Sequence, residues 1–383
     1  MRYLTSGESH GPQLTAIIEG IPAGLKLEAF HIDELLKARQ KGYGRGKRMK
    51  IEQDRVQILG GVRHGLTLGS PITLVIANKD NANWGAIMSP EPQPDLEYQQ
   101  KKSPRAGHAD LVGAMKYGHR DLRNVLERSS ARETAIRVAV GAVAIQLLKQ
   151  LGIGVIAHVI QIGKEKSPRT ATTIKAMVQP LKDSPVRCLD KKASEAMCQH
   201  IDEARKNGDT LGGKIQLIAE GVPAGLGSYV HYDRKLDGKL AAALISVQTV
   251  KGISFGNVEA SGTHLGSKVH DQITYENGFS RKSNNYGGFE GGMTNGMPLV
   301  MEATLKPIPT LYRPLDSVHI DDKTIQKGMI ERSDTCVLPA ACTVLEAVAA
   351  TVLATEILEM FRSDTMEGLI RDFAAYGQEV DNF

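Results

Sequence analysis

The chain has 383 residues, of which 41% are hydrophobic and 23% are charged, so it is long and apolar enough to bury a sizeable core. Its 47 Lys and Arg residues nearly balance 43 Asp and Glu residues, and a formal net charge of only +4 argues against a protein that acts mainly on nucleic acid. The longest apolar run, Val138 to Leu148, is far shorter than the ~18 residues of a membrane span, and a secretory signal is missing from Met1 onward. We therefore expect a cytoplasmic globular protein without membrane partners.

The cysteines point to a reducing compartment. None of the four forms a C-x-x-C pair or has a histidine partner at zinc-finger spacing, so free thiols and no structural metal are expected at Cys188, Cys198, Cys336 and Cys342.

The first predicted strand, Gln13 to Glu19, follows a glycine-bounded turn that contains Ser9 and His10. A similar turn later in the chain, Arg-Ala-Gly-His-Ala-Asp, contains His108. An imidazolium can donate a proton at neutral pH, so two loop histidines near arginines suggest acid catalysis beside a departing phosphate.

A basic, glycine-rich loop runs from Lys37 to Lys50, after a short helical pattern that starts at Ile32. Its glycines allow close backbone approach, and Arg39, Arg45 and Arg48 each carry a planar fork that suits phosphate or carboxylate. RNA binding is the rival interpretation, but aromatic residues for base stacking are scarce. The chain also lacks the P-loop and Rossmann glycine patterns.

The strand predicted over Ile72 to Ala77 is followed by a Pro-rich segment, Ser89 to Pro104, which is expected to form a long surface loop. Next, Ser130 and Glu133 have the spacing of a capping box that opens a helix reaching Leu151. The free N–H groups of such a helix start, flanked by Arg128 and Arg132, predict an anion site.

Strands are also predicted over Lys214 to Glu220 and Leu299 to Leu305, and a second Ala-rich helix over Pro339 to Phe361. Strands and helices alternate, which indicates a mixed α+β fold. The helices around Val138 and Val344 are apolar on nearly all faces, so we expect them to be buried between sheets.

Two motifs recur in the same order along the chain. The sequence Glu-Gly-Ile-Pro-Ala-Gly-Leu at 19–25 returns as Glu-Gly-Val-Pro-Ala-Gly-Leu at 220–226, and a G-G-x-x-x-G-x-T-x-G-x-P pattern occurs at 60–71 and 287–298. Ordered recurrence predicts one domain over residues 1–383, built by internal duplication from halves of about 1–200 and 201–383.

Several motifs together resemble the signatures of the chorismate synthase family. They are Ser-Gly-Glu-Ser-His-Gly at the start of the chain, Arg-Ala-Gly-His-Ala-Asp, Arg-Ser-Ser-Ala-Arg-Glu-Thr, and Arg-Ser-Asp-Thr-Cys at 332–336. Further matches are Val-Lys-Gly-Ile-Ser-Phe-Gly at 250–256, the glycine-rich run at 283–296, and Lys-Pro-Ile-Pro-Thr at 306–310. The resemblance covers essentially the whole length.

The resemblance implies a lyase that converts 5-enolpyruvylshikimate 3-phosphate to chorismate by anti 1,4-elimination of phosphate, in the shikimate pathway to the aromatic amino acids. It implies reduced FMN without net redox change, a β-α-β sandwich fold and a homotetramer. Because a separate reductase domain is not recognisable, NADPH is expected to reduce the flavin through an external reductase.

The resemblance also implies roles for individual residues. His10 would assist phosphate departure, His108 would keep the reduced flavin protonated, and Asp334, through Ser9, would act in proton removal via flavin N5. The substrate would be held by Arg39, Arg45, Arg48, Arg105, Arg132 and Arg332, of which Arg39 and Arg45 are also candidate NADPH contacts. The FMN set would be Ser130, Ala131, Arg132, Gln248, Thr249, Gly291, Lys306, Pro307, Ile308, Pro309, Thr310 and Arg332.

The sequence departs from the family pattern at Ala106, where proline is usual, at Thr249, where alanine is usual, and in Asp-Thr-Cys, where Asp-Pro-Cys is usual. None of these departures removes a charged group assigned to the chemistry. The alternative function is a non-catalytic flavin- or phosphate-binding paralogue, against which the retained His10, His108 and Asp334 argue.

Overall fold

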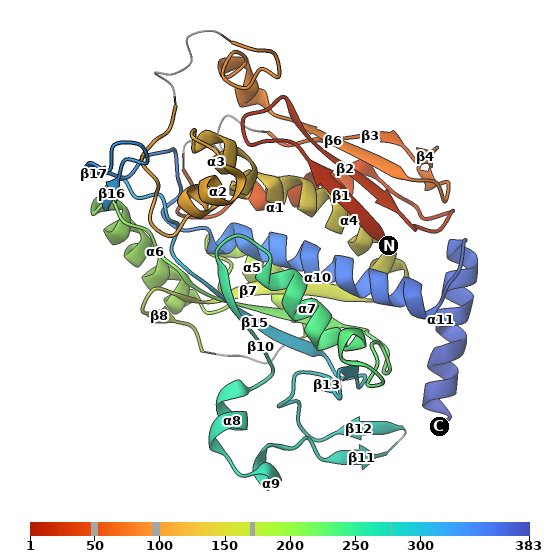
Figure 1. Cartoon of the computed structure of the whole chain (residues 1–383). Helices are drawn as coiled ribbons and strands as arrows, with labels where there is room; N and C mark the ends of the chain where they lie inside the picture. Colours follow the sequence, from red (N-terminus) through yellow and green to blue (C-terminus); the bar gives the residue numbers. More distant parts are fainter. Residues whose placement is uncertain (47–52, 94–99, 169–172, 277) are drawn as a thin grey trace.

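Two long apolar helices, α4 (Thr134–Gln150) and α10 (Leu338–Met360), lie between two antiparallel sheets in the computed structural model (Figure 1). The structure describes residues 1–46, 53–93, 100–168, 173–276 and 278–383. The mixture of helices and sheets confirms the predicted α+β class.

The first sheet has the strand order β1-β2-β6-β3, and all its pairs are antiparallel. The elements up to α4 are β1 (Arg2–Ser6), β2 (Gln13–Glu19), α1 (Ala29–Gln40), β3 (Val56–Gly60), β4 (Val62–Arg63), β5 (Leu66–Thr67), β6 (Ile72–Ala77), the 3-10 helix η2 (Lys79–Asn83), α2 (Asp110–Tyr117), α3 (Arg123–Ser129) and the 3-10 turn η4 (Ala131–Glu133).

The second sheet has the order β10-β15-β9-β7-β8, again antiparallel throughout. Besides α10, the elements after α4 are β7 (Gly154–Ile162), β8 (Glu165–Lys166), α5 (Ile174–Asp183), α6 (Lys191–Lys206), β9 (Gly213–Glu220), η5 (Tyr232–Arg234), α7 (Leu236–Ile245), β10 (Val250–Phe255), α8 (Val258–Thr263), α9 (Gly266–Val269), β11 (Ile273–Tyr275), β12 (Phe279–Arg281), β13 (Phe289–Glu290), β14 (Met293–Thr294), β15 (Leu299–Leu305), β16 (Asp316–Val318), β17 (Ile325–Lys327) and α11 (Met366–Asp381).

Alternation of apolar residues explains how the first sheet faces the helices. Along β2, the side chains of Leu14, Ala16 and Ile18 are buried while their neighbours are more exposed, as period-2 alternation requires. This strand and β6 contact α4. In β9 the residues 215–219 are all buried, because α10 contacts one face of the sheet and Ile218 on the other face packs with residues of α5.

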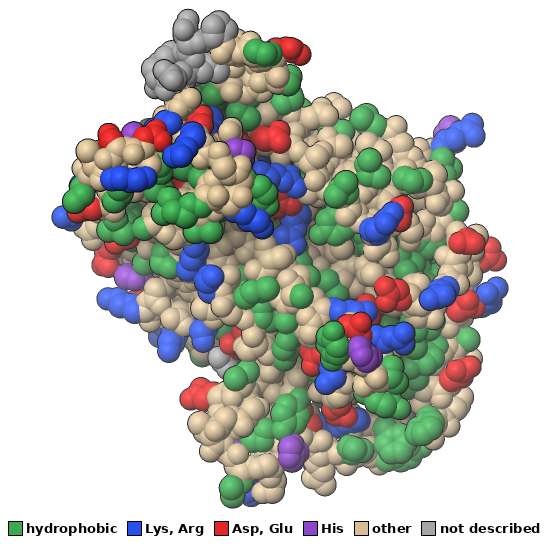
Figure 2. Space-filling view, viewed as in Figure 1, with side chains coloured by type: hydrophobic (Ala, Val, Ile, Leu, Met, Phe, Trp, Pro, Cys, Tyr) green, Lys and Arg blue, Asp and Glu red, His purple; other side chains and the backbone are tan. Residues whose placement is uncertain are grey.

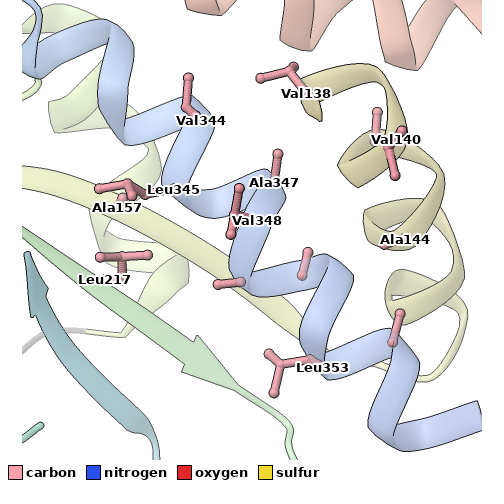
Figure 3. Packing of buried hydrophobic residues seen from close by; sticks show 14 of the residues in the cluster. Val138, Val140, Ala144, Ala157, Leu217, Val344, Leu345, Ala347, Val348 and Leu353 are labelled. Atoms are coloured by element: carbon pink, nitrogen blue, oxygen red, sulfur yellow. The ribbon is translucent and has the colours of Figure 1, made fainter. Parts of the chain in front are cut away.

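Small residues allow α4 and α10 to approach closely (Figure 3). A Cβ placed on Gly141 would lie 2.4 Å from both the Cβ and the carbonyl oxygen of Ala347, so only glycine fits at this crossing. By length and composition α10 is the one helix among the described residues that could cross a membrane, but 83% of its apolar window is buried inside the molecule. It is a core helix.

The repeated motifs make the same contacts in both parts of the chain. The Thr67 side chain accepts the N–H of Leu25 and donates to the carbonyl of Pro22. In the second part, the Thr294 side chain accepts the N–H of Leu226 and donates to the carbonyl of Pro223. The pairing β1-β2-β6-β3 also matches β7-β9-β15-β10. The strand β7 at residues 154–162 thus lies in the second sheet although it precedes residue 200.

The four strands and two core helices predicted from the sequence are all present within a few residues of their expected bounds. The edge strand β1 was not predicted. The capping box is formed only in part: the Ser130 hydroxyl accepts the N–H of Arg132, whereas the Glu133 carboxylate accepts from Thr5 and Gln248. The residues at either end of the Pro-rich segment form loops, as expected, and residues 94–99 lie outside the described residues.

Candidate active site

A cavity of about 490 Å³ lies where the N-terminal ends of α4 and α10 meet the loops that precede β2, α2 and β10. This volume suits a small-molecule ligand. One wall is apolar and comes from α10 and the residue before it: Val337, Ala340, Ala341 and Val344. Figure 2 shows Lys and Arg side chains gathered around a hollowed region beside the segment that carries α2 and α3.

The cavity lining is strongly cationic. Among the described residues, six cations line it, namely Arg39, Arg45, Arg105, Arg132, Arg332 and Lys306, against the two acids Glu331 and Asp334. Such a site favours a ligand with several negative charges. The structure thus brings together all predicted substrate arginines except Arg48, which lies outside the described residues.

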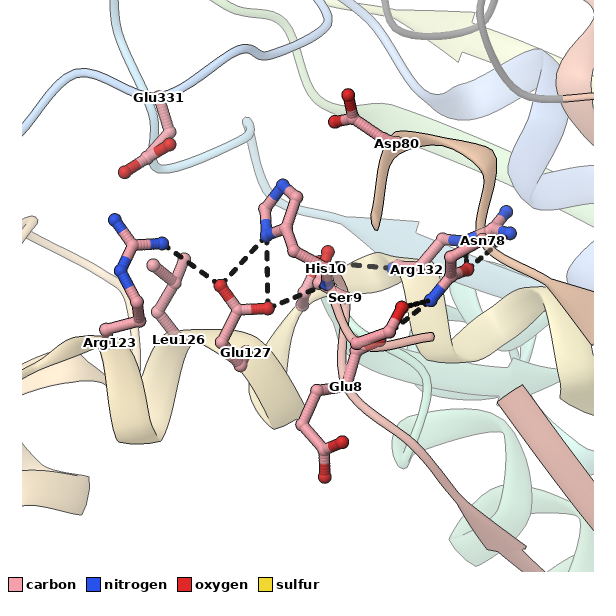
Figure 4. Close-up of polar contacts among 12 residues, drawn as sticks. Glu8, Ser9, His10, Asn78, Asp80, Arg123, Leu126, Glu127, Arg132 and Glu331 are labelled. Atoms are coloured by element: carbon pink, nitrogen blue, oxygen red, sulfur yellow. Dashed lines mark hydrogen bonds and ion pairs between the residues drawn. The ribbon is translucent and has the colours of Figure 1, made fainter. Parts of the chain in front are cut away.

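The His10 ring is held from several sides (Figure 4). Its Nδ1 lies 2.9 Å from Oε1 of Glu127, whose Oε2 accepts the backbone N–H of His10 at 2.8 Å. The Trp84 ring stacks on the imidazole with centroids 4.0 Å apart. Burial alone would raise the pKa of the Glu127 carboxyl, but the hydrogen bonds from His10 and the charge of Arg123 hold it below its ordinary value.

The His108 ring is held by Asp110, a fully buried residue at the start of α2. Its Nδ1 lies 2.6 Å from Asp110 Oδ1 and 3.1 Å from Arg105 Nη2. Arginine only donates hydrogen bonds, so Nδ1 cannot satisfy both neighbours; the shorter contact indicates Nδ1–H donating to Asp110. Although burial opposes ionisation, the bonds from His108 and Arg105 hold the pKa of Asp110 well below its usual range.

Most of the cavity arginines also form hydrogen bonds or ion pairs with other residues of the same chain. Arg132 donates to both carboxylate oxygens of Asp54 and to the side-chain oxygen of Asn78. Arg39 donates to Thr134 and to the carbonyl of Ala131. These contacts fix the guanidinium planes, so the groups are positioned before a ligand arrives.

Two further ion pairs connect distant parts of the chain at the cavity. Arg45 donates to Asp334 over 2.6 Å, and the other carboxylate oxygen of Asp334 accepts the N–H of Gly46. Arg332 donates to Asp80 at the end of the first sheet. Both carboxylate oxygens of Asp334 are therefore held in place, one by Arg45 and the other by the backbone of Gly46. The hydroxyl of Ser9 accepts a hydrogen bond from Ser130.

The residues predicted to contact FMN lie mostly along the same cavity. Ser130, Ala131, Gln248, Thr249, Lys306, Ile308, Pro309 and Thr310 line it. Pro307 is exposed and does not line it, and Gly291 lies in the tight turn between β13 and β14, apart from the cavity. Burial and the charge of Lys251 lower the pKa of Lys306.

Three buried oxygens in the lining have no hydrogen-bond partner among the described residues: the Oε1 of Gln248, the Oγ1 of Thr249 and the Oε1 of Glu331. Only the last of them has an ion pair, with Lys101. Thr249 also has a φ of 76°, a conformation that is unusual for a β-branched residue. Strained backbone and unpartnered polar atoms at a cavity indicate a ligand that completes them.

The sequence analysis did not identify the carboxylates that bond to the two candidate catalytic histidines, His10 and His108. Asp110 follows His108 by two residues, and this spacing is a signal that was available. Glu127 and Trp84 lie 117 and 74 positions from His10, and only the folded chain brings them to its ring. Within the described ranges, no group of three or more His, Cys, Asp or Glu side chains is arranged to hold a metal, and all four cysteines are free.

A cationic cavity that contains two positioned histidines and a carboxylate defines an enzyme that binds a small polyanion and transfers protons at it. Comparisons with known proteins identify the family to which this enzyme belongs. The family model for chorismate synthase matches residues 1–358. A chorismate synthase of Geobacillus sp. (strain WCH70) is 57% identical over 372 residues, which cover 96% of each chain. Chorismate synthase 1 of Bacillus cereus (strain ATCC 14579) is 57% identical over 379 residues, 97% of each chain.

A crystal structure of chorismate synthase superimposes with a TM-score of 0.80 at 38% identity, covering 100% of this chain and 98% of the other. The chain belongs to the chorismate synthase family.

Proposed function

We propose that this chain catalyses the anti 1,4-elimination of phosphate from 5-enolpyruvylshikimate 3-phosphate, which gives chorismate. The observation that carries the proposal is the meeting of His10, His108 and Asp334 in one cationic cavity of a chorismate synthase family member. The substrate has two carboxylates and a phosphate, and the cavity arginines supply complementary charge.

We assign the phosphate of the substrate to the side of the cavity near His10. In the elimination, the C–O bond to phosphate breaks and its electron pair stays on the phosphate oxygen, while a ring proton is lost. His10 is placed to protonate that oxygen, because Nδ1 is bonded to Glu127 and Nε2 is the remaining donor. Asp334, paired with Arg45, is the proposed group for removal of the ring proton, acting through Ser9.

The lining also fits reduced FMN. The unpartnered oxygens of Gln248 and Thr249 can accept hydrogen bonds from a flavin ring, and the apolar wall from α10 offers it a flat contact. When bound, reduced FMN would supply an electron-rich ring that promotes C–O cleavage without net redox change. His108, with Nδ1 bonded to Asp110, would present Nε2 as the proton donor or acceptor on that side of the cavity.

We propose that NADPH reduces the flavin through an external reductase. Arg39 and Arg45 are the candidate contacts for direct NADPH binding, but Arg39 is only 5% exposed and both arginines already bind partners in the protein. This engagement favours the external route.

We also propose a cytoplasmic homotetramer whose chain is a single domain formed by internal duplication. The identical hydrogen bonds of Thr67 and Thr294 support the duplication. The proposed halves are about 1–200 and 201–383, and β7 of the first half pairs with β9 in the second sheet. Sedimentation equilibrium tests the tetramer, for which four times the chain mass of 41.5 kDa is expected.

The decisive experiment is anaerobic turnover of 5-enolpyruvylshikimate 3-phosphate with chemically reduced FMN, measuring chorismate and phosphate. Equimolar products are expected, and none should form with NADPH and oxidised FMN unless a reductase is added. The alternative, a non-catalytic flavin- or phosphate-binding paralogue, is disfavoured because all three acid–base candidates are present. Tight flavin binding without any product would support that alternative and refute the proposal.

A further inference from the structure

Glu127 holds the loop that carries His10 at several points. Its carboxylate accepts from the backbone N–H of His10 and from ring Nδ1, and its carbonyl accepts the N–H of Ser9 at 3.0 Å. Both Glu127 and His10 are buried, at 4% and 6% exposure. A buried carboxylate used in this way both restrains a ring and selects its tautomer.

The surrounding side chains restrain the carboxylate and the ring further. Arg123 donates to Glu127 Oε1 over 3.1 Å, one turn earlier on α3. Its guanidinium also lies over the ring of Trp84, 4.8 Å from the centroid, and Trp84 in turn stacks on His10. The four side chains form a closed ring of contacts, so a shift of any one disturbs the others.

We propose that Glu127 is a positioning residue for phosphate departure, acting through His10; this rests on the proposed function. The carboxylate only accepts hydrogen bonds, so it keeps Nδ1 protonated and leaves Nε2, which points away from Glu127 in Figure 4, as the proton donor. When the C–O bond breaks, the Nε2 proton moves to the phosphate oxygen, and the neutral ring stays bonded to Glu127 through Nδ1–H.

A double-mutant cycle tests this inference. In the wild-type background, Glu127→Gln removes the negative charge and places an NH₂ group opposite one of the two N–H donors of His10. We therefore expect kcat to fall by about 30-fold, with KM changed less than about twofold. In a His10→Ala background, the same substitution should change kcat by less than about twofold, because the residue through which Glu127 acts is gone. Equal losses in both backgrounds, or an unchanged kcat for Glu127→Gln, would overturn the proposal.

Glu8→Gln is the matched control. Glu8 lies two residues from His10, but it is exposed and its carboxylate points away from the ring (Figure 4). We expect wild-type kcat from this variant, and a loss as large as that of Glu127→Gln would mean that any nearby negative charge suffices, contrary to the proposal. Trp84 is the only tryptophan, so its emission checks that Glu127→Gln and Glu8→Gln keep the imidazole stacked on it.

A measurement on the unaltered protein avoids any folding defect of the variants. With ¹⁵N-labelled histidine, the neutral ring of His10, assigned by its loss in His10→Ala, should show a protonated Nδ1 and an unprotonated Nε2. The opposite tautomer would overturn the inference. If the wild-type protein makes no chorismate, the proposed function is wrong. If it makes chorismate but Glu127→Gln causes the same loss of kcat with and without His10, only the proposed role of Glu127 is wrong.

Discussion

Substitution of Gly141 by alanine tests whether the close crossing of α4 and α10 organises the molecule. A Cβ at Gly141 would lie 2.4 Å from the carbonyl oxygen of Ala347 and 2.6 Å from its carbonyl carbon. Favourable separations of such atoms are about 3.5 Å or more, so the two helices must separate by roughly 1 Å. Because the contacts are with backbone, no side-chain rotation relieves them.

The expected cost follows from two opposing terms. Overpacking of a rigid core contact costs about 3 kcal/mol, near the upper end of its usual range. Alanine gains about 1 kcal/mol over glycine from helix propensity. The net loss in the free energy of unfolding should therefore be about 2 kcal/mol, seen as a lower urea midpoint monitored by circular dichroism.

Gly377→Ala provides the matched control, because Gly377 lies inside α11 and a Cβ placed on it would meet open space. The same chemical change should here stabilise the protein by up to about 1 kcal/mol. If Gly141→Ala were as stable as wild type while Gly377→Ala gained stability, the crossing would be looser than the structure indicates and the packing argument would be wrong.

Three further outcomes are expected. Asp110→Asn should lower the unfolding free energy near neutral pH by about 3 kcal/mol, because buried Arg105 loses its ion-pair partner. Since the pKa of Asp110 is depressed below 3.8, its contribution is complete above that pH and is lost as the pH falls toward the folded value. The melting temperatures of wild type and variant should accordingly converge in acid, and a constant gap would contradict the assignment. Burial raises the pKa of Cys336 and Cys342 to about 12, so neither thiol should react with Ellman's reagent before unfolding; rapid labelling of either would refute their burial. Thr249→Gly should raise the melting temperature by relieving a strain of about 1 kcal/mol, yet weaken FMN binding in fluorescence titrations, and unchanged FMN affinity would remove Thr249 from the proposed flavin contacts.

Local sequence patterns predicted much of the fold. The alternation in β2 and the mostly apolar sequence of α10 depend only on neighbouring residues, so both were predictable from the sequence. The repeated Gly-Pro motifs were also visible, because a duplicated turn keeps its own chemistry. What they contact was not visible: the hydrogen bonds to Thr67 and Thr294 join segments more than 40 residues apart.

The sequence by itself determined the class of chemistry, because arginines, loop histidines and family motifs can be recognised without knowing where they meet. Tertiary structure decided how those groups are used. Arg132 was expected to bind substrate, yet its fork is fixed by Asp54 and Asn78. Glu127 carries no local signal, since its effect depends on a distance to His10 that only packing creates. Residue types specify which protons and charges are available, whereas the folded core sets the distances that decide which of them act.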